Sequence, residues 1–144
     1  MDRGSVMSLK GKFGLTGIAA LAFAASLVTA GSANAASWYS DPNSCTGAAT
    51  AVSRIVSGRT IQVRYGNCDG TQHGWGRILN YDGSEYIRFE VDTNGDRSPD
   101  GYSYYRAGNR NYTAGYPTSN SSSRAFRACM STGPCSSGNA TAWW

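Results

Sequence analysis

Hydrophobic and polar residues alternate most regularly in two segments, residues 59–65 and 86–91. Because successive side chains of a strand point to opposite faces of its sheet, both segments are predicted to be strands with one buried face. Arg88 and Glu90 are then expected on the opposite, outward face of the second strand. The positions predicted to face the core are Ile61, Val63, Tyr65, Ile87, Phe89 and Val91.

Weaker alternation predicts further strands at 75–79, 102–106, 112–116 and 124–129, while residues 48–56 fit either a short helix or a strand. Turns or loops are expected from composition at 57–58, 66–74, 80–83, 92–101 and 118–123. No long segment has a 3.6-residue apolar period. The pattern therefore predicts an all-β fold, a small antiparallel sandwich or barrel stapled by disulfides.

The first 35 residues have the layout of a secretory signal peptide. A positive start is followed by an apolar run from about residue 13 to 30 and by a small-residue site that ends at Ala35. We expect cleavage after Ala35, a secreted, extracellular protein, and no transmembrane anchor after cleavage. Residues 36–144 are then a single domain, with a flexible tail predicted from about residue 134.

Charge and cysteine content describe the expected environment. Residues 36–144 contain ten arginines, no lysine and eight acidic residues, a balance that argues against dedicated nucleic-acid binding. An even number of cysteines in an exported chain predicts two disulfides. Of three possible pairings, Cys45–Cys68 and Cys129–Cys135 is favoured, because it links neighbours and suits a meandering sheet. A zinc site is disfavoured, because no C-x-x-C is present and His73 is the only histidine.

One set of residues offers catalytic chemistry. His73 with Glu85 or Glu90 and an arginine supplies the base, acid and cation that RNA cleavage requires, so a small secreted ribonuclease is one alternative. These residue types occur in almost any domain of this size, and His73 is interpreted as an ordinary loop residue. Glu85 and Glu90 have an odd spacing, which puts them on opposite faces of a strand and disfavours glycoside hydrolysis.

Residues 92–101 resemble a calcium loop. Oxygen-bearing side chains stand at alternating positions and again four residues later, at Asp92, Asn94, Asp96 and Asp100. Arg97 replaces the usual glycine, and Ser103 stands where a bidentate glutamate is expected. An ordinary hairpin connection is therefore favoured. Calcium as a cofactor belongs to an alternative function, that of a calcium-supported surface structural protein.

Tyrosine and arginine are concentrated in the second half of the chain, and both are typical of contact surfaces. The other interpretation is that these tyrosines alternate across a two-faced sheet. The pair Trp143-Trp144 either forms an exposed contact patch or folds back onto the sheet. The residues predicted to bind a target are Trp75, Tyr102, Tyr104, Tyr105, Arg106 and Arg110.

A strand ending in Arg64-Tyr65, then Cys68, then Trp75-Gly76-Arg77 forms a pattern that extends to residues 112–113 and 125–129. This pattern resembles a family of small secreted actinobacterial proteins of unknown function, over roughly residues 45–130. The chain lacks the extra N-terminal cysteines that members often carry. The resemblance implies secretion and a compact β fold, and it implies no reaction and no catalytic residues.

These observations favour a secreted, non-enzymatic binding or effector domain. Its expected partner is an extracellular carbohydrate or another extracellular protein, and with a protein target it would act as an inhibitor or a toxin-like effector. The ribonuclease and the calcium-supported surface protein remain the alternatives from other classes.

Overall fold

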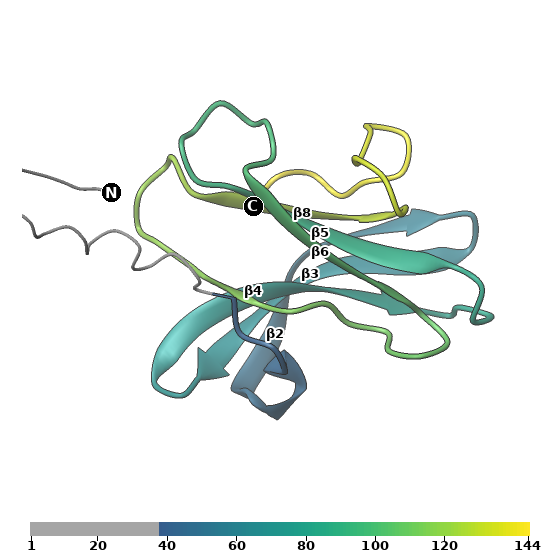
Figure 1. Ribbon diagram of the computed structural model, residues 1–144, viewed down its shortest axis with the longest axis horizontal. Helices are drawn as coiled ribbons and strands as arrows, with labels where there is room; N and C mark the ends of the chain where they lie inside the picture. The colour runs from purple at the N-terminus through teal and green to yellow at the C-terminus, as the bar shows by residue number, and fades with distance from the viewer. Residues whose placement is uncertain (1–37) are drawn as a thin grey trace, which may run out of the picture. The chain divides into compact units, whose positions relative to one another are not determined.

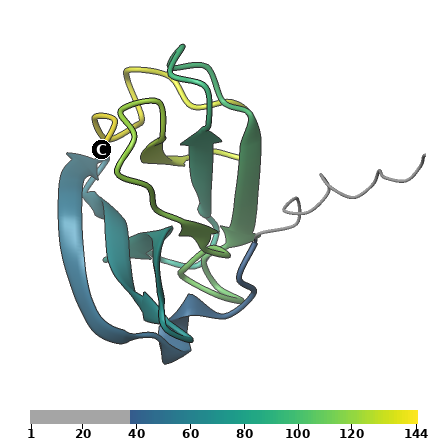
Figure 2. The same cartoon turned by 90° about the vertical axis from the view of Figure 1, so that its left-hand side faces the viewer.

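A computed structural model describes residues 38–144, and these form two antiparallel sheets that face each other (Figures 1 and 2). One sheet has the strand order β2-β3-β4-β7 and the other the order β6-β5-β8. The all-β prediction is confirmed, and of its two forms the structure has the sandwich. The elements are η2 (Pro42–Ser44), β2 (Thr46–Val56), β3 (Arg59–Cys68), β4 (Thr71–Leu79), β5 (Tyr86–Asp92), β6 (Gly101–Arg106), β7 (Tyr116–Pro117) and β8 (Ala125–Met130).

Within the described part of the chain, no helix is long and apolar enough to span a membrane. The predicted signal peptide, residues 1–35, lies outside the described residues.

Strands β2, β3 and β4 form a meander joined by two tight turns. In the first turn φ is 49° at Ser57 and 79° at Gly58, and in the second it is 53° at Asp69 and 87° at Gly70. Both dipeptides therefore occupy the left-handed region that two-residue hairpins favour. The turn at Ser57-Gly58 is as predicted, and residues 48–56 belong to a strand. The loop predicted at 66–74 is wrong, because only Asp69-Gly70 leaves the ladder between β3 and β4.

The glycines of residues 66–74 explain this error. A Cβ at Gly74 would lie 2.7 Å from the ring of Phe126, and a Cβ at Gly66 would lie 3.2 Å from the Trp75 ring. Both glycines are therefore needed for close packing inside a sheet, whereas composition alone indicates a loop.

The hydrophobic core lies between the two sheets, as the alternation predicts. Five of the six positions expected to face inward are buried, with relative exposure of 1% or less: Ile61, Val63, Ile87, Phe89 and Val91. Tyr65 is half-buried and stacks on Trp144, with 5.2 Å between the ring centroids. Phe126 and Ala128 of β8 complete the core from the second sheet.

The end of the chain pairs with β8, whereas composition predicts a flexible tail there. Thr141 N–H donates to Ala128 (2.8 Å), and Trp144 and Phe126 exchange two backbone hydrogen bonds of 2.8 Å. Residues 139–144 thus cover the edge of β8 that β5 leaves free. The backbone of Trp143-Trp144 thus folds back onto the sheet, while Trp144 remains 41% exposed.

The predicted disulfide pairing is confirmed. Cys45–Cys68 joins the segment before β2 to the end of β3, and Cys129–Cys135 joins β8 to the following loop, with Cα–Cα distances of 4.5 and 5.7 Å. No free cysteine is present among residues 38–144. Two disulfides in a domain of this size indicate an oxidising environment.

Candidate functional site

The residues predicted to bind a target lie in different parts of the sandwich. Tyr102, Tyr104 and Arg106 alternate along β6 and are exposed on the outer face of the three-stranded sheet. Tyr105 points the other way, is half-buried and has the guanidinium of Arg110 4.1 Å from its ring centroid. The structure therefore brings part of the predicted set together.

Trp75 does not belong to this surface. Its side chain lies across Gly66 beside Ala48 and is 4% exposed. The start of β2 covers it, and local sequence around Trp75 carries no signal of that distant contact.

The outer face of β5 and β6 carries a cluster of tyrosine rings. Tyr102 and Tyr104 are 55% and 44% exposed, and their rings stack with 6.1 Å between centroids. Tyr86, opposite Arg106 in the register, adds a third ring 6.0 Å from that of Tyr104. We call Tyr86, Tyr102, Tyr104 and Arg106 the tyrosine face. Sequence reasoning missed Tyr86, although its two-residue spacing from Arg88 places both on one side of β5.

A buried cation supports the tyrosine face. The guanidinium carbon of Arg88 lies 4.0 Å from the ring centroid of Tyr102. Arg88 itself donates to Glu90 (2.9 Å) and to the carbonyl oxygen of Thr132 (2.9 Å). Because these bonds fix the guanidinium, the ring of Tyr102 rests on an immobilised cation–π contact.

Glu90 is the centre of a buried ion triad made by Arg88, Glu90 and Arg127. Its side chain is 0% exposed and accepts three hydrogen bonds of 2.9 Å, from both arginines and from Cys135 N–H. Burial alone raises the pKa of Glu90, but the Cys135 N–H and the two guanidinium groups outweigh burial and lower that pKa. Glu90 is therefore an ionised structural residue.

A depression of about 320 Å³ lies beside the tyrosine face at β6, an edge strand of its sheet. We call it the β6 groove. Trp38 is fixed there by edge-on packing against Tyr116, with 5.0 Å between ring centroids. Ser103 is held by a 3.1 Å hydrogen bond from Ala114 N–H. Four of the six lining residues are aromatic and none is charged: Trp38, Tyr102, Ser103, Tyr104, Tyr105 and Ala114.

The structure does not bring the candidate catalytic residues together. His73 belongs to β4, not to a loop, and lies on the outer face of the four-stranded sheet, where it is 7% exposed. Its Nδ1 is 2.9 Å from the carbonyl oxygen of Thr71. Glu90 lies on the outer face of the opposite sheet, because it alternates with the core residues Phe89 and Val91.

Glu85 is held in the turn after β4. It accepts from the N–H groups of Asp82 and Gly83, each at 2.9 Å, and pairs with Arg59. Burial raises the pKa of Glu85, but the Asp82 N–H and Arg59 outweigh burial and lower that pKa to about 2. With lowered pKa values, neither Glu85 nor Glu90 is suited to donate a proton near neutral pH.

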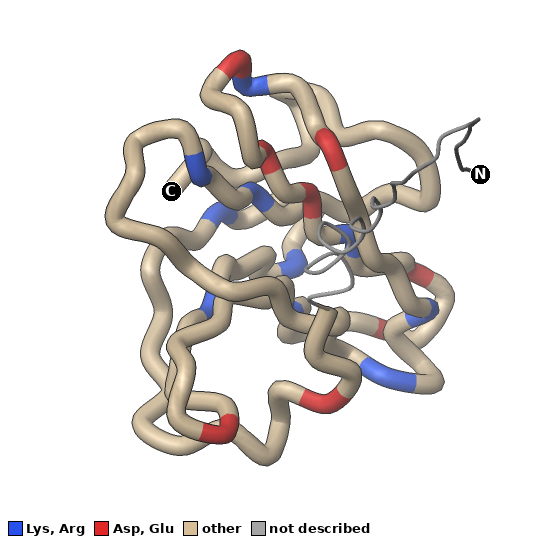
Figure 3. Tube along the Cα trace, turned by 60° about the vertical axis from the view of Figure 1, so that its left-hand side comes forward, with Lys and Arg blue, Asp and Glu red and all other residues tan. Residues whose placement is uncertain are grey.

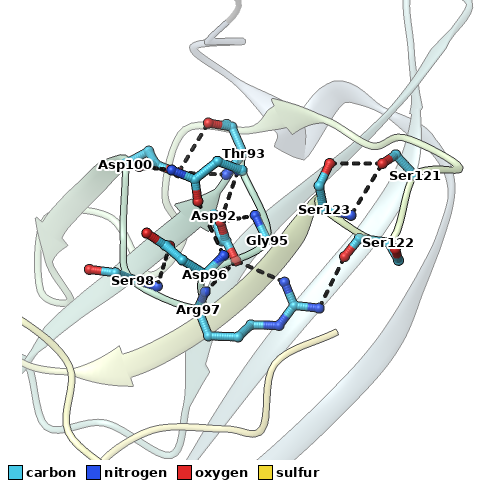
Figure 4. A network of polar contacts seen from close by, with 11 residues as sticks. Asp92, Thr93, Gly95, Asp96, Arg97, Ser98, Asp100, Ser121, Ser122 and Ser123 are labelled. Atoms are coloured by element: carbon cyan, nitrogen blue, oxygen red, sulfur yellow. Dashed lines mark hydrogen bonds and ion pairs between the residues drawn. The ribbon is translucent and has the colours of Figure 1, made fainter.

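The 92–101 loop brings three carboxylates together, with ligand atoms of Asp92, Asp96 and Asp100 within 4.8 Å of one another (Figure 4). Asp92 is fully buried and already accepts four hydrogen bonds. These come from the N–H groups of Asn94 (3.0 Å), Gly95 (2.8 Å) and Arg97 (2.7 Å), and from the Arg97 guanidinium (2.8 Å). Burial raises the pKa of Asp92, but Arg97 and these N–H groups lower it to about 2.

Arg97 thus supplies a positive charge to the loop that the sequence indicates only as an alternative calcium site. Its guanidinium also donates to the carbonyl oxygen of Ser122 (3.2 Å), which ties this loop to residues 121–123. The oxygen of Asn94 accepts from Asp96 N–H (3.2 Å). A calcium ion at this loop would have to displace Arg97 from Asp92.

Arginine and acidic positions both occur along the described trace (Figure 3). Comparison with protein-family models, with curated proteins and with solved structures finds no match to this chain.

Proposed function

We propose that this protein is exported and acts outside the cell as a binding domain for a neutral glycan chain. The β6 groove is the proposed binding site, and the tyrosine face extends it. One observation carries the proposal: four aromatic side chains and no charged one line a shallow, open depression at an edge strand. Ligand sites are commonly concave and rich in aromatic side chains, with a few polar groups that fix orientation.

The chemistry of the groove suits a sugar chain. Aromatic rings offer apolar faces against which the C–H faces of sugar rings pack, and tyrosine hydroxyls offer hydrogen bonds to sugar hydroxyls. The lining residues carry no charge that would select an ionic ligand. Tyr102 and Tyr104 belong to both the groove and the tyrosine face, so a chain can pass from one to the other.

Preorganisation supports a binding role. Tyr102 rests on Arg88, which the buried ion triad holds, and Trp38 packs against Phe89 and Tyr116. Rings that are fixed before the ligand arrives lose little conformational entropy on binding. The separation of His73 from the carboxyls favours binding over catalysis.

Export is proposed from two observations that agree. The N-terminal residues have the composition of a signal peptide, and all four cysteines form disulfides.

The test is a titration of the purified, oxidised protein against a panel of soluble neutral polysaccharides and their oligosaccharides. We expect binding to at least one of them, weakened about 30-fold by Tyr102→Ala or Tyr104→Ala, as for truncation of a central aromatic contact. Tyr81→Ala is the matched control, since Tyr81 is 41% exposed but lies in the connection between β4 and β5. The proposal is wrong if no neutral glycan binds, or if both groove variants bind as tightly as the unchanged protein.

A further inference from the structure

A second depression, of about 330 Å³, shares no lining residue with the β6 groove. We call it the Trp144 pocket. Its apolar lining consists of Trp144 and Phe126, and residues from the start of β4 and from the segment between β7 and β8 supply polar groups. Gln72, Thr118 and Arg124 are among these polar residues.

Trp144 presents an exposed ring on a fixed backbone. Its N–H and carbonyl oxygen each form a 2.8 Å hydrogen bond with Phe126. The indole stacks on Tyr65, with 5.2 Å between centroids and 25° between planes, yet the residue remains 41% exposed. An aromatic side chain that is anchored but still open to solvent is suited to stack against a ligand.

The polar wall of the pocket is also held in place. Thr118 N–H donates to the backbone carbonyl of Gln72 (3.0 Å), and Thr118 Oγ1 donates to Gln72 Oε1 (2.9 Å). These two bonds connect the segment after β7 to the start of β4, so both sides of the pocket keep their spacing.

Arg124 gives the pocket a positive charge. Its guanidinium carbon lies 5.1 Å from the ring centroid of Tyr116, and its Nη1 donates to the carbonyl oxygen of Pro117. Within residues 38–144, Arg124 takes part in none of the ion pairs, and its buried Nε has no hydrogen-bond partner. No aspartate or glutamate side chain lines the pocket.

We propose that the Trp144 pocket binds a sugar unit that carries a carboxylate, such as a uronic acid. The indole of Trp144 would pack against the ring of the sugar, and Arg124 would pair with its carboxylate through charge-assisted hydrogen bonds. Gln72 is placed to bond with the sugar hydroxyls. This site would give the protein selectivity for acidic sugars in addition to the proposed binding of neutral glycans. It rests on the proposed function only for the choice of a saccharide as the ligand class.

The experiment is calorimetric titration with galacturonate oligosaccharides and with galactose oligosaccharides of the same length. Titrations use both the unchanged protein and the Tyr104→Ala variant, in which binding at the β6 groove is expected to be weakened. We expect selective galacturonate binding in both proteins, weaker at high ionic strength, because salt screens the interaction of the arginine with the carboxylate.

Arg124→Gln should weaken galacturonate binding about tenfold or more, since a hydrogen bond to a charged group is lost. Trp144→Leu should weaken it too, while Trp143→Leu, the matched control, should not, because the Trp143 ring packs against Arg127 instead. Circular dichroism checks folding. If Trp144→Leu fails to fold, Gln72→Ala takes its place as the second pocket variant.

Three results overturn the inference: no galacturonate binding, equal binding of both sugars to Tyr104→Ala, or unchanged affinity in Arg124→Gln. Loss of galacturonate binding alone leaves neutral glycan binding at the β6 groove intact. Loss of neutral glycan binding alone leaves the acidic-sugar site intact.

Discussion

Replacing Glu90 by glutamine tests whether the buried ion triad holds the three-stranded sheet and the loop after β8. The substitution keeps the shape of the side chain but removes the charge that pairs with Arg88 and Arg127. It also replaces one carboxylate oxygen by an amide N–H₂ group. That group would face hydrogen-bond donors, because Arg88, Arg127 and the Cys135 N–H all donate to this carboxylate. Two guanidinium groups then remain largely buried without a counter-ion.

Breaking a buried ion pair by removing one partner costs about 3–5 kcal/mol. That is a large part of the 5–15 kcal/mol typical of a whole domain. At roughly 4 °C per kcal/mol for a chain of this size, the melting temperature should fall by about 10–20 °C. The Cys129–Cys135 disulfide limits the loss, because it keeps the loop attached to β8.

The assay is urea unfolding at neutral pH without reductant, followed by circular dichroism. Asp96→Asn is the control, since Asp96 is exposed and makes no ion pair within residues 38–144. A loss of less than about 1 kcal/mol for Glu90→Gln would refute the argument that an ionised Glu90 organises this region.

Three further predictions concern the loops and the core. The pKa of Asp92 is about 2 in the folded protein and about 3.9 in the unfolded chain. The stabilising contribution of Asp92 is therefore complete above about pH 4 and is lost as the pH falls to about 2. The free energy of unfolding of Asp92→Asn should lack this part of the pH dependence. A Cβ at Gly74 would meet the Phe126 ring at 2.7 Å, so Gly74→Ala should lower the free energy of unfolding by about 1–3 kcal/mol, whereas Gly138→Ala, with open space around it, should not. Because Arg97 already pairs with Asp92, neither calcium nor a chelator should move the melting temperature; an increase with calcium of several degrees would show that the ion displaces Arg97.

Local alternation predicted most of the fold. The two-residue period identified β3 and β5 and their buried faces, and it indicated a strand at β6, without separating the exposed Tyr102 and Tyr104 from the half-buried Tyr105. The two disulfides followed from their order in the chain. These features depend on neighbours in sequence, which is why a single sequence contains them.

The predictions that failed concern residues whose surroundings depend on distant contacts. Trp75 is an outward-facing residue of β4 that the start of β2 covers, and Glu90 is an outward-facing residue of β5 that Cys135 covers. No pattern within β4 or β5 indicates that Trp75 or Glu90 is buried by a distant segment. Gly74 suggested a loop, because glycine indicates both turns and tight packing, and only the position of Phe126 distinguishes them.

The short loop closed by Cys129–Cys135 has a practical consequence for laboratory work. It carries the carbonyl of Thr132 that holds Arg88 and the N–H of Cys135 that holds Glu90, so the order of Tyr102 depends on a covalent bond at the far strand of the same sheet. Thiol reagents such as dithiothreitol, added by habit to purification buffers, would loosen the Tyr102 ring without touching it. Ligand screens on this protein therefore belong in reductant-free solution, with the redox state verified by mass spectrometry beforehand.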